Sequence, residues 1–240
     1  MSEITNADYI AEAKKALNDP VLQNALADLQ ARFGRATALA YRNLPEGPDL
    51  RLKAHEIRAK TIENLDVVLE TLAENVRKNG GQVFFADDAD DALDYCLATA
   101  RRHKVKLAVK GKSMVSEEIG LNTALIGAGI EVAETDLGEY IIQLAGERPS
   151  HIIAPAIHKT RTDIGKLFTD KIDIPYTDDP PSLTRAARKA LRQKFLAADI
   201  GFSGCNMACA ETGCQKLGQP VPESYLVSDR NKSWPQAAQV

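Results

Sequence analysis

The sequence has few aromatic residues, no excess of basic charge and no long apolar run. Aromatics make up 5% of the 240 residues and the formal net charge is −3, which argues against a nucleic-acid-binding protein. No apolar run approaches the roughly 20 residues of a membrane span, and the N-terminus lacks the features of a secretory signal. Four cysteines are too few for a disulfide scaffold. We therefore expect a cytoplasmic globular protein without a nucleic-acid partner or a membrane span.

The first 80 residues predict a helical region. Apolar residues recur at helical spacing over 6–33, with an interruption at Pro20, and a loop is expected at 43–48. A longer amphipathic helix is predicted to begin at Asp49 and to end before Asn79-Gly80-Gly81. This helix suits packing on its own domain, and a partner-binding role is the alternative.

After Gly81, apolar runs of strand length alternate with helical patterns. The expected strands are 83–86, 105–109, 130–133 and 151–154, and the expected helices are 87–102, 113–129, 137–145, 159–168 and 181–196. This alternation predicts an α/β fold with a parallel sheet, whose chemistry gathers at the carboxyl ends of the strands. From Gln215 onward the pattern predicts an irregular tail.

One candidate site lies where the second predicted strand ends. Lys110, Gly111, Lys112 and Ser113 form a strand-to-helix turn, where lysines and free N–H groups favour an anionic ligand. The spacing of a P-loop is missing. The alternative is an ordinary turn with solvated lysines.

A second candidate follows the third strand. Glu134, Asp136 and Glu139 could act as acid and base if they lie close together, because neighbouring carboxylates raise one another's pKa. Their spacing alone favours helix capping by Asp136, with Glu139 reaching back.

A third candidate is His158 with Lys159, in the loop before another helix. A histidine there could act as a general base or bind an anion when protonated, whereas His151 is more simply structural. Because the carboxyl ends of parallel strands share one edge, all three candidate sites are predicted to face one crevice.

Cys205, Cys209 and Cys214 fall within ten residues, but neither the ferredoxin spacing nor a zinc pair with x2 spacing is present. The favoured interpretation is small buried thiols, and no metal site is expected. Cys96 fits the core of a helix.

Three runs resemble the lactate-utilisation (LUD) domain family, and within it the B-type iron–sulfur subunits. They are Lys110–Ile119, Glu134–Leu144 and Pro149–Arg161, and stretches of 198–213 resemble the family's next signature. The resemblance implies an α/β fold like that of sugar-phosphate isomerases and CoA-transferases. It also implies work with A-type and C-type partner subunits in oxidising L-lactate to pyruvate, and [4Fe–4S] clusters in full-length members.

The resemblance stops after Gly213, and the ferredoxin cysteine run is absent. We therefore expect a helical region at 1–80, an incomplete lactate-utilisation domain at 81–213, and an irregular tail at 214–240 of a truncated chain without a cofactor of its own. Lys110, Gly111, Lys112, Ser113 and Lys159 are the expected contacts of a small anionic substrate. The expected acid–base groups are Glu134, Asp136, Glu139 and His158. The alternatives are a non-catalytic partner-binding module and an inactive truncation product.

Overall fold

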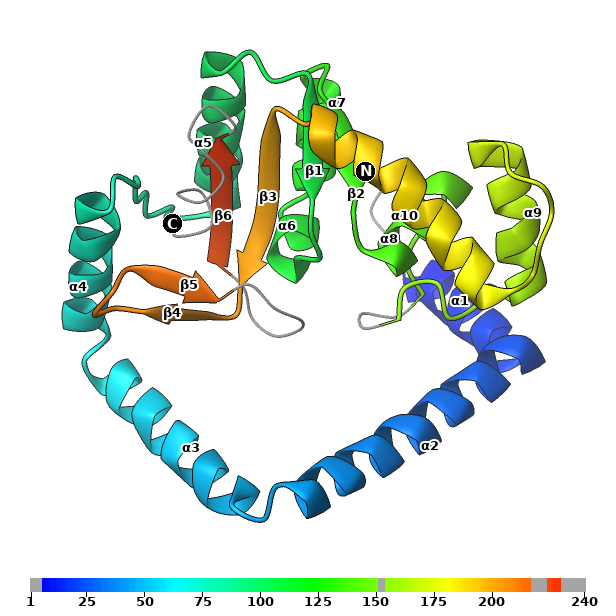
Figure 1. The fold of residues 1–240 in the computed structure, drawn as a ribbon, viewed down its shortest axis with the longest axis horizontal. Coiled ribbons are helices and arrows are strands. Elements are labelled where there is room, and N and C mark those ends of the chain that lie inside the picture. Colours follow the sequence, from blue (N-terminus) through cyan, green and yellow to red (C-terminus); the bar gives the residue numbers. More distant parts are fainter. Residues whose placement is uncertain (1–5, 151–153, 217–223, 230–240) are drawn as a thin grey trace.

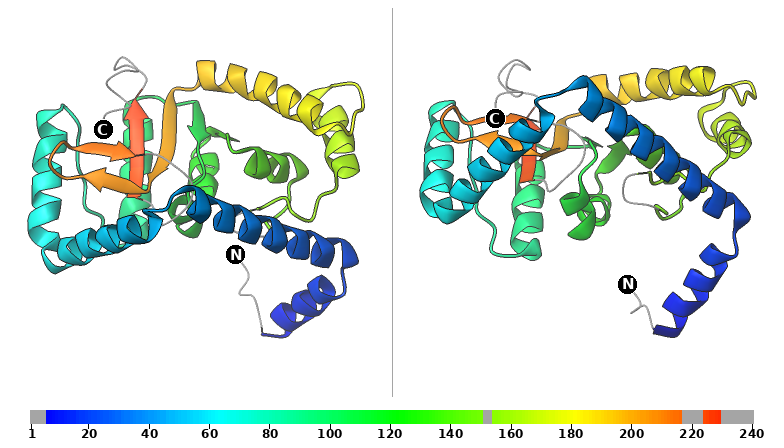
Figure 2. Two further views of the ribbon diagram at one scale, coloured as in Figure 1. Left: turned by 60° about the horizontal axis from the view of Figure 1, so that its bottom comes forward. Right: turned by 90° about the horizontal axis from the view of Figure 1, so that it is seen from below.

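The computed structural model describes residues 6–150, 154–216 and 224–229. Four helices come first: α1 (Asn6–Leu17), α2 (Pro20–Asn43), α3 (Gly47–Glu63) and α4 (Leu65–Lys78). Helices α2 and α3 form a V that stands away from the sheet and leads to α4 beside the hairpin of β4 and β5 (Figure 1). Figure 2 shows α1 projecting from the far end of α2.

The α1–α2 break follows from capping chemistry. Asp19 Oδ1 accepts hydrogen bonds from Val21 N (2.9 Å) and Leu22 N (3.1 Å), and Pro20 occupies the first turn, where its missing N–H costs nothing. The interruption expected at Pro20 is therefore confirmed.

The single helix expected from Asp49 to Lys78 is wrong. The chain leaves helical geometry at Asn64, so α3 and α4 are separate helices, and α3 begins at Gly47 with Asp49 inside its first turn. The apolar spacing contains the reason: Ile57 and Ile62 are five residues apart, which places them on different faces of one helix. The predicted stop is confirmed, because α4 ends at Lys78 and Gly80 has a φ of +86°.

A four-stranded sheet in the order β2-β1-β3-β6 carries the α/β part. Strands β1 (Leu107–Lys110), β2 (Glu131–Glu134) and β3 (Ile200–Cys205) are parallel, and β6 (Ser224–Asp229) is antiparallel to β3. The fold is thus a mixed α/β fold with three parallel strands, as the alternating pattern predicts. The irregular tail expected at 214–240 is wrong for two described stretches: Cys214–Lys216 form β5, and β6 forms an edge of the sheet.

Helices cover both faces of the sheet. On one face, α5 (Ala89–Arg102) and α7 (Leu121–Gly127) pack on β1, β2 and β3 around Ala100, Leu121 and Leu125, none of which has exposed surface. On the other face, α8 (Leu137–Ala145) and α10 (Pro180–Ala197) cover the strands, with α9 (Arg161–Ile172) packed beside them around Phe168. Helix α6 (Met114–Glu118) follows β1.

The strand expected at 83–86 is wrong. Val83–Ala86 have no regular structure, because the sheet position beside β3 is taken by β6, and Phe84 instead stacks on Tyr95 of α5 with ring centroids 4.4 Å apart. The strand expected at 151–154 falls on 151–153, which lie outside the described residues. No helix in the described part of the chain is both long and apolar enough to cross a membrane.

A two-stranded hairpin of β4 (Met207–Cys209) and β5 (Cys214–Lys216) leaves the end of β3. The turn of the hairpin is hydrogen-bonded to the C-terminal part of α4 and its C-cap residue. Asn75 Nδ2 donates to Ala210 O (2.8 Å) and Glu211 O (3.1 Å), and Asn79 Nδ2, at the C-cap, donates to Thr212 O (2.9 Å). The hairpin therefore connects the helical region to the α/β part.

Candidate functional site

The centre of the candidate site is an ion pair between neighbouring strands. Lys110 ends β1, Glu134 ends β2, and the two are register partners. Ala108 and Val132 pack in the core under α7, and side chains alternate along a strand, so Lys110 and Glu134 point to the same face. Lys110 Nζ lies 3.1 Å from Glu134 Oε1, and the two side chains are 0% and 7% exposed.

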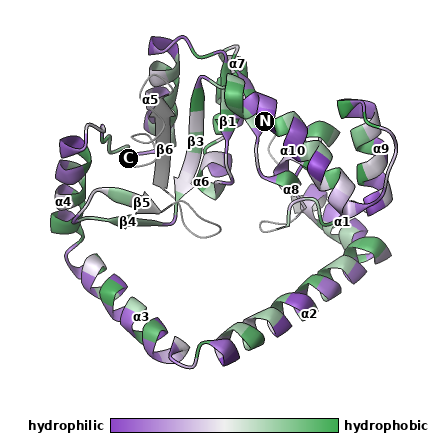
Figure 3. Cartoon of the chain, viewed as in Figure 1, coloured by the Kyte–Doolittle hydropathy of each residue, from purple (hydrophilic) through white to green (hydrophobic). Residues whose placement is uncertain are grey.

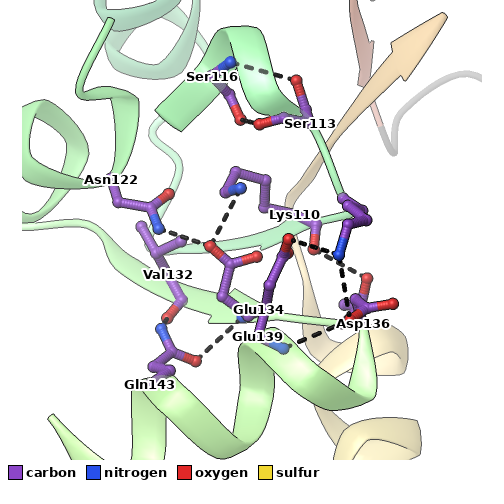
Figure 4. Close-up of polar contacts among 11 residues, drawn as sticks. Lys110, Ser113, Ser116, Asn122, Val132, Glu134, Asp136, Glu139 and Gln143 are labelled. Carbon is purple, nitrogen blue, oxygen red and sulfur yellow. Dashed lines mark hydrogen bonds and ion pairs between the residues drawn. The ribbon is translucent and has the colours of Figure 1, made fainter. Parts of the chain in front are cut away.

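Glu134 is held by two further side chains (Figure 4). Asn122 Nδ2 of α7 donates to Glu134 Oε1 at 2.6 Å. Gln143 of α8 accepts from Glu134 N and donates to Val132 O. Burial, which disfavours a charged carboxylate, raises the pKa of Glu134, although Lys110 and Asn122 act against it.

Lys112 extends the site toward α8. Its side chain is 6% exposed, and its Nζ lies 3.5 Å from Glu139 Oε1 and 3.9 Å from Asp136 Oδ1. Asp136 also caps α8 by accepting from Gly138 N and Glu139 N, so its predicted capping role is confirmed. Lys112 is therefore a buried lysine facing carboxylates, not a solvated one.

Gly111 and Ser113 have backbone roles in the same turn. Gly111 N donates to Phe202 O (2.8 Å), which continues the pairing of β1 with β3, and a Cβ on Gly111 would make only ordinary contact with Ser203 Oγ at 3.5 Å. Ser113 Oγ accepts a hydrogen bond from Ser116 N (3.2 Å) and caps α6. Its hydroxyl is thus engaged within the protein.

Glu117 joins the site from α6, and sequence reasoning missed it. Glu117 is exposed as a residue, yet desolvation of its carboxyl comes first among the causes that raise its pKa to about 7, followed by the charge of Glu139. A hydrogen bond between the Glu117 and Glu139 carboxyls adds to the rise. Glu117 stands four residues after Ser113, one turn into the helix that Ser113 caps, which is the signal that could have found it.

These contacts leave two buried polar atoms of the ion pair with unused hydrogen-bonding capacity. Among the described residues, Lys110 Nζ has no hydrogen-bond acceptor beyond its Glu134 ion pair, and Glu134 Oε2 has no donor. An ammonium group has three protons and a carboxylate several acceptor positions. The ion pair therefore keeps an unused donor on Lys110 and an unused acceptor on Glu134.

His158 and Lys159 make a separate set of contacts. His158 Nδ1 lies 2.5 Å from Ser150 Oγ, and His158 Nε2 lies 2.8 Å from Glu147 Oε2. Lys159 also pairs with Glu147, and its hydrogen bond and that of His158 lower the pKa of this carboxyl. These side chains therefore bind one another, and the crevice they were expected to share with Lys112 stays a prediction.

The cysteines do not fit an iron–sulfur cluster. Cys205 is buried with its Sγ on Met207 O (3.1 Å), whereas Cys209 and Cys214 are exposed. A [4Fe–4S] cluster takes four thiolates, and within the described ranges no three His, Cys, Asp or Glu residues are grouped to hold a metal. The expectation of buried thiols is correct for Cys96 and Cys205, and wrong for Cys209 and Cys214.

Fold and site together define an α/β protein with a buried lysine–carboxylate centre at the carboxyl edge of its parallel strands. The LUD domain model matches residues 69–215, more than half of the chain, so the chain belongs to the LUD domain family.

The curated relatives agree with this family. The chain is 43% identical over 215 residues to Lactate utilization protein B of Oceanobacillus iheyensis, covering 90% of this chain and 45% of that protein. It is 41% identical over 209 residues to the Uncharacterized electron transport protein YkgF of Escherichia coli K12, covering 87% and 44%. It is 45% identical over 197 residues to Lactate utilization protein B 2 of Bacillus mycoides, covering 82% and 42%. The chain thus spans less than half the length of these relatives, and no solved structure matches it.

Proposed function

We propose that this chain is a B-type lactate-utilisation domain that binds L-lactate, or its oxidation product pyruvate, in a cytoplasmic complex with A-type and C-type subunits. The observation that carries the proposal is the convergence of Lys110, Lys112, Glu134 and Glu139 at the ends of two parallel strands. A sugar-phosphate isomerase or CoA-transferase-like arrangement, which also uses this edge, is the fold we propose for the full domain.

The chemistry of a 2-hydroxycarboxylate suits the polar atoms of the site. The substrate carboxylate needs donors, and the buried Nζ of Lys110 has protons to give. The substrate hydroxyl needs an acceptor, which Glu134 Oε2 supplies. A carboxyl with a pKa near 7, such as Glu117, can take up or release a proton at neutral pH. We propose that this site carries out only the proton transfer of lactate oxidation and not the transfer of electrons.

Lactate-dependent dye reduction, with the A-type and C-type subunits added, tests the proposal. Glu117→Gln removes the titrating group, and Glu118→Gln on the same short helix is the matched control, because Glu118 is exposed like Glu117 but is not the carboxyl that shares a hydrogen bond with Glu139. We expect Glu117→Gln to lower the rate by 10²–10³-fold, within the roughly 10²–10⁴-fold typical of general acid–base catalysis, and Glu118→Gln to leave it unchanged. Equal rates for both variants, or no lactate-dependent reduction by the wild-type assembly, would contradict it.

The second candidate function is partner docking through α2 and α3. None of the described residues of α2 is buried. Large apolar side chains on both helices are exposed; on α2 they are Val21, Phe33, Leu39 and Tyr41, and on α3 they are Leu50, Leu52, Ile57 and Ile62. Figure 3 shows hydrophobic residues spread along both helices. Pull-down of the partner subunits by the wild type, but not by a Phe33→Asp/Leu39→Asp variant, is the expected result, and equal capture by both would exclude it.

A further inference from the structure

The two exposed cysteines of the hairpin face each other. Cys209 ends β4, Cys214 begins β5, and they are direct partners in the antiparallel register. Residues directly opposite in such a ladder have Cα atoms about 4.5–5.5 Å apart and side chains on the same face. A disulfide requires Cα atoms about 4.4–6.8 Å apart. The backbone therefore already holds this pair at bonding separation.

The turn between the cysteines is fixed from outside. Asn75 and Asn79 donate to three of its carbonyl oxygens. Gly213, with a φ of +70°, lies so close to α4 that a Cβ there would be 2.8 Å from the backbone of Asn75 and Val76. Closing a bond across a turn already held in place loses little further chain entropy.

Thr212 distinguishes the two thiols. Its hydroxyl accepts a hydrogen bond from Cys214 N at 3.2 Å. Hydrogen bonds from Thr212, first from its side chain and then from its backbone, lower the pKa of Cys209. Since the thiolate is the attacking species, this lowered pKa favours attack by Cys209.

We propose that Cys209 and Cys214 form a reversible redox site, a dithiol that low-molecular-weight disulfides convert to an intramolecular disulfide. The Cys209 thiolate attacks one sulfur of the small disulfide, whose S–S bond breaks and releases one thiolate. Cys214, losing its proton, then attacks the Cys209 sulfur and releases the second thiolate. Two protein thiols are oxidised, one small disulfide is reduced, and the two protons end on the two small thiols.

The other two cysteines stay outside this reaction. Cys205 is 3% exposed and bonds to the Met207 carbonyl. Cys96 is 3% exposed, and burial raises the pKa of its thiol to about 11. They serve as internal controls in the same molecule.

The test incubates the full chain with oxidised glutathione and maps thiols by mass spectrometry. We expect the wild type to carry one Cys209–Cys214 disulfide and no retained glutathione, with Cys96 and Cys205 still reduced. The Cys214→Ser variant should retain one glutathione on Cys209, because its resolving thiol is gone. Glutathione retained on both exposed cysteines, a bond to Cys205, or dimers linked between chains would overturn the proposal.

Two further variants separate this site from chance proximity. Thr212→Val should slow the first step several-fold because the thiolate loses its hydroxyl donor, whereas Thr212→Ser should keep the wild-type rate. Asn75→Ala should let more mixed disulfide accumulate by loosening the turn, while Glu70→Ala, an exposed change on the same helix, should not. Wild-type behaviour of both Thr212→Val and Asn75→Ala would show that neither the threonine nor α4 prepares the pair, and would contradict the proposal.

Discussion

Lys110 and Glu134 are register partners at the last positions of adjacent parallel strands, and their opposite charges meet 3.1 Å apart with almost no exposed surface. Taking either charge out of water alone costs several kcal/mol, which their mutual attraction offsets only while both are present. The pair therefore holds the ends of β1 and β2 together, and losing either partner leaves the other charge buried.

Lys110→Met should destabilise the fold by about 3–5 kcal/mol, because it leaves Glu134 charged and buried without its partner. Lys194→Met is the matched control. It breaks the ion pair of Lys194 with Glu131, on the same strand as Glu134 but exposed, and should cost less than about 1 kcal/mol. Urea unfolding measures both. Similar losses for the two variants would show that burial does not set the strength of the Lys110 pair.

Glu117 should make stability depend on pH. Its pKa is raised from the ordinary 4.5 to about 7, so between these values the native state binds more protons than the unfolded state. Stability therefore falls as the pH rises through this window. Glu117→Gln should remove this fall and gain about 1 kcal/mol over wild type at pH 8, a value reduced from the full shift because solvent screens the partly exposed group. Glu118→Gln should keep the wild-type pH profile, measured by urea midpoints from pH 5 to 8.

Lys112→Glu should weaken binding of small carboxylates at the site by about 1–3 kcal/mol, the range of a charge-assisted hydrogen bond. The new carboxylate would face Glu139 and Asp136 and repel an anionic ligand. Lys106→Glu, an exposed change just before β1, is the control. Calorimetric titration with pyruvate checks this, and unchanged affinity in the Lys112 variant would place the ligand elsewhere.

Two glycines in helices should respond in opposite ways to alanine. A Cβ on Gly165 would lie 2.2 Å from Thr177 O, so Gly165→Ala must push apart α9 and the segment before α10 and should destabilise by about 1–3 kcal/mol. Gly34, in α2, has open space around it, and Gly34→Ala should stabilise its helix by about 0.5–1 kcal/mol. Thermal melts followed by circular dichroism compare the two.

The sequence predicts the alternation of strands and helices and several caps well, because these depend on neighbours in the chain. Asp136 caps α8 as its spacing predicts, and the interruption at Pro20 separates α1 from α2. The prediction from sequence failed where pairing between distant segments decides which residues form strands. Val83–Ala86 contain strand-forming residues but do not pair in the sheet, whereas Ser224–Asp229 form a strand although few local signals predict one.

The candidate site divides in the same way. Lys110 and Glu134 were identified because each ends an apolar run, and parallel register then brings them together. The sequence did not predict Asn122 as a site residue. Gly120, with a φ of +73°, turns the chain between α6 and α7, and this turn directs α7 toward Glu134. No local sequence pattern predicts that such a turn brings Asn122 into contact with Glu134, which lies 12 positions further along the chain.

The absence of buried residues in α2 gives this molecule two levels of local stability. Backbone amides that open independently of a packed core exchange their protons with solvent through small local fluctuations, whereas those of β1, buried along its whole length, exchange only when the sheet itself opens. A protease should therefore cut first within α2 while the sheet and its covering helices stay folded. Because α2 is locally less stable than the sheet, α2 can change its conformation on binding another protein without disturbing the charged residues at the ends of the strands.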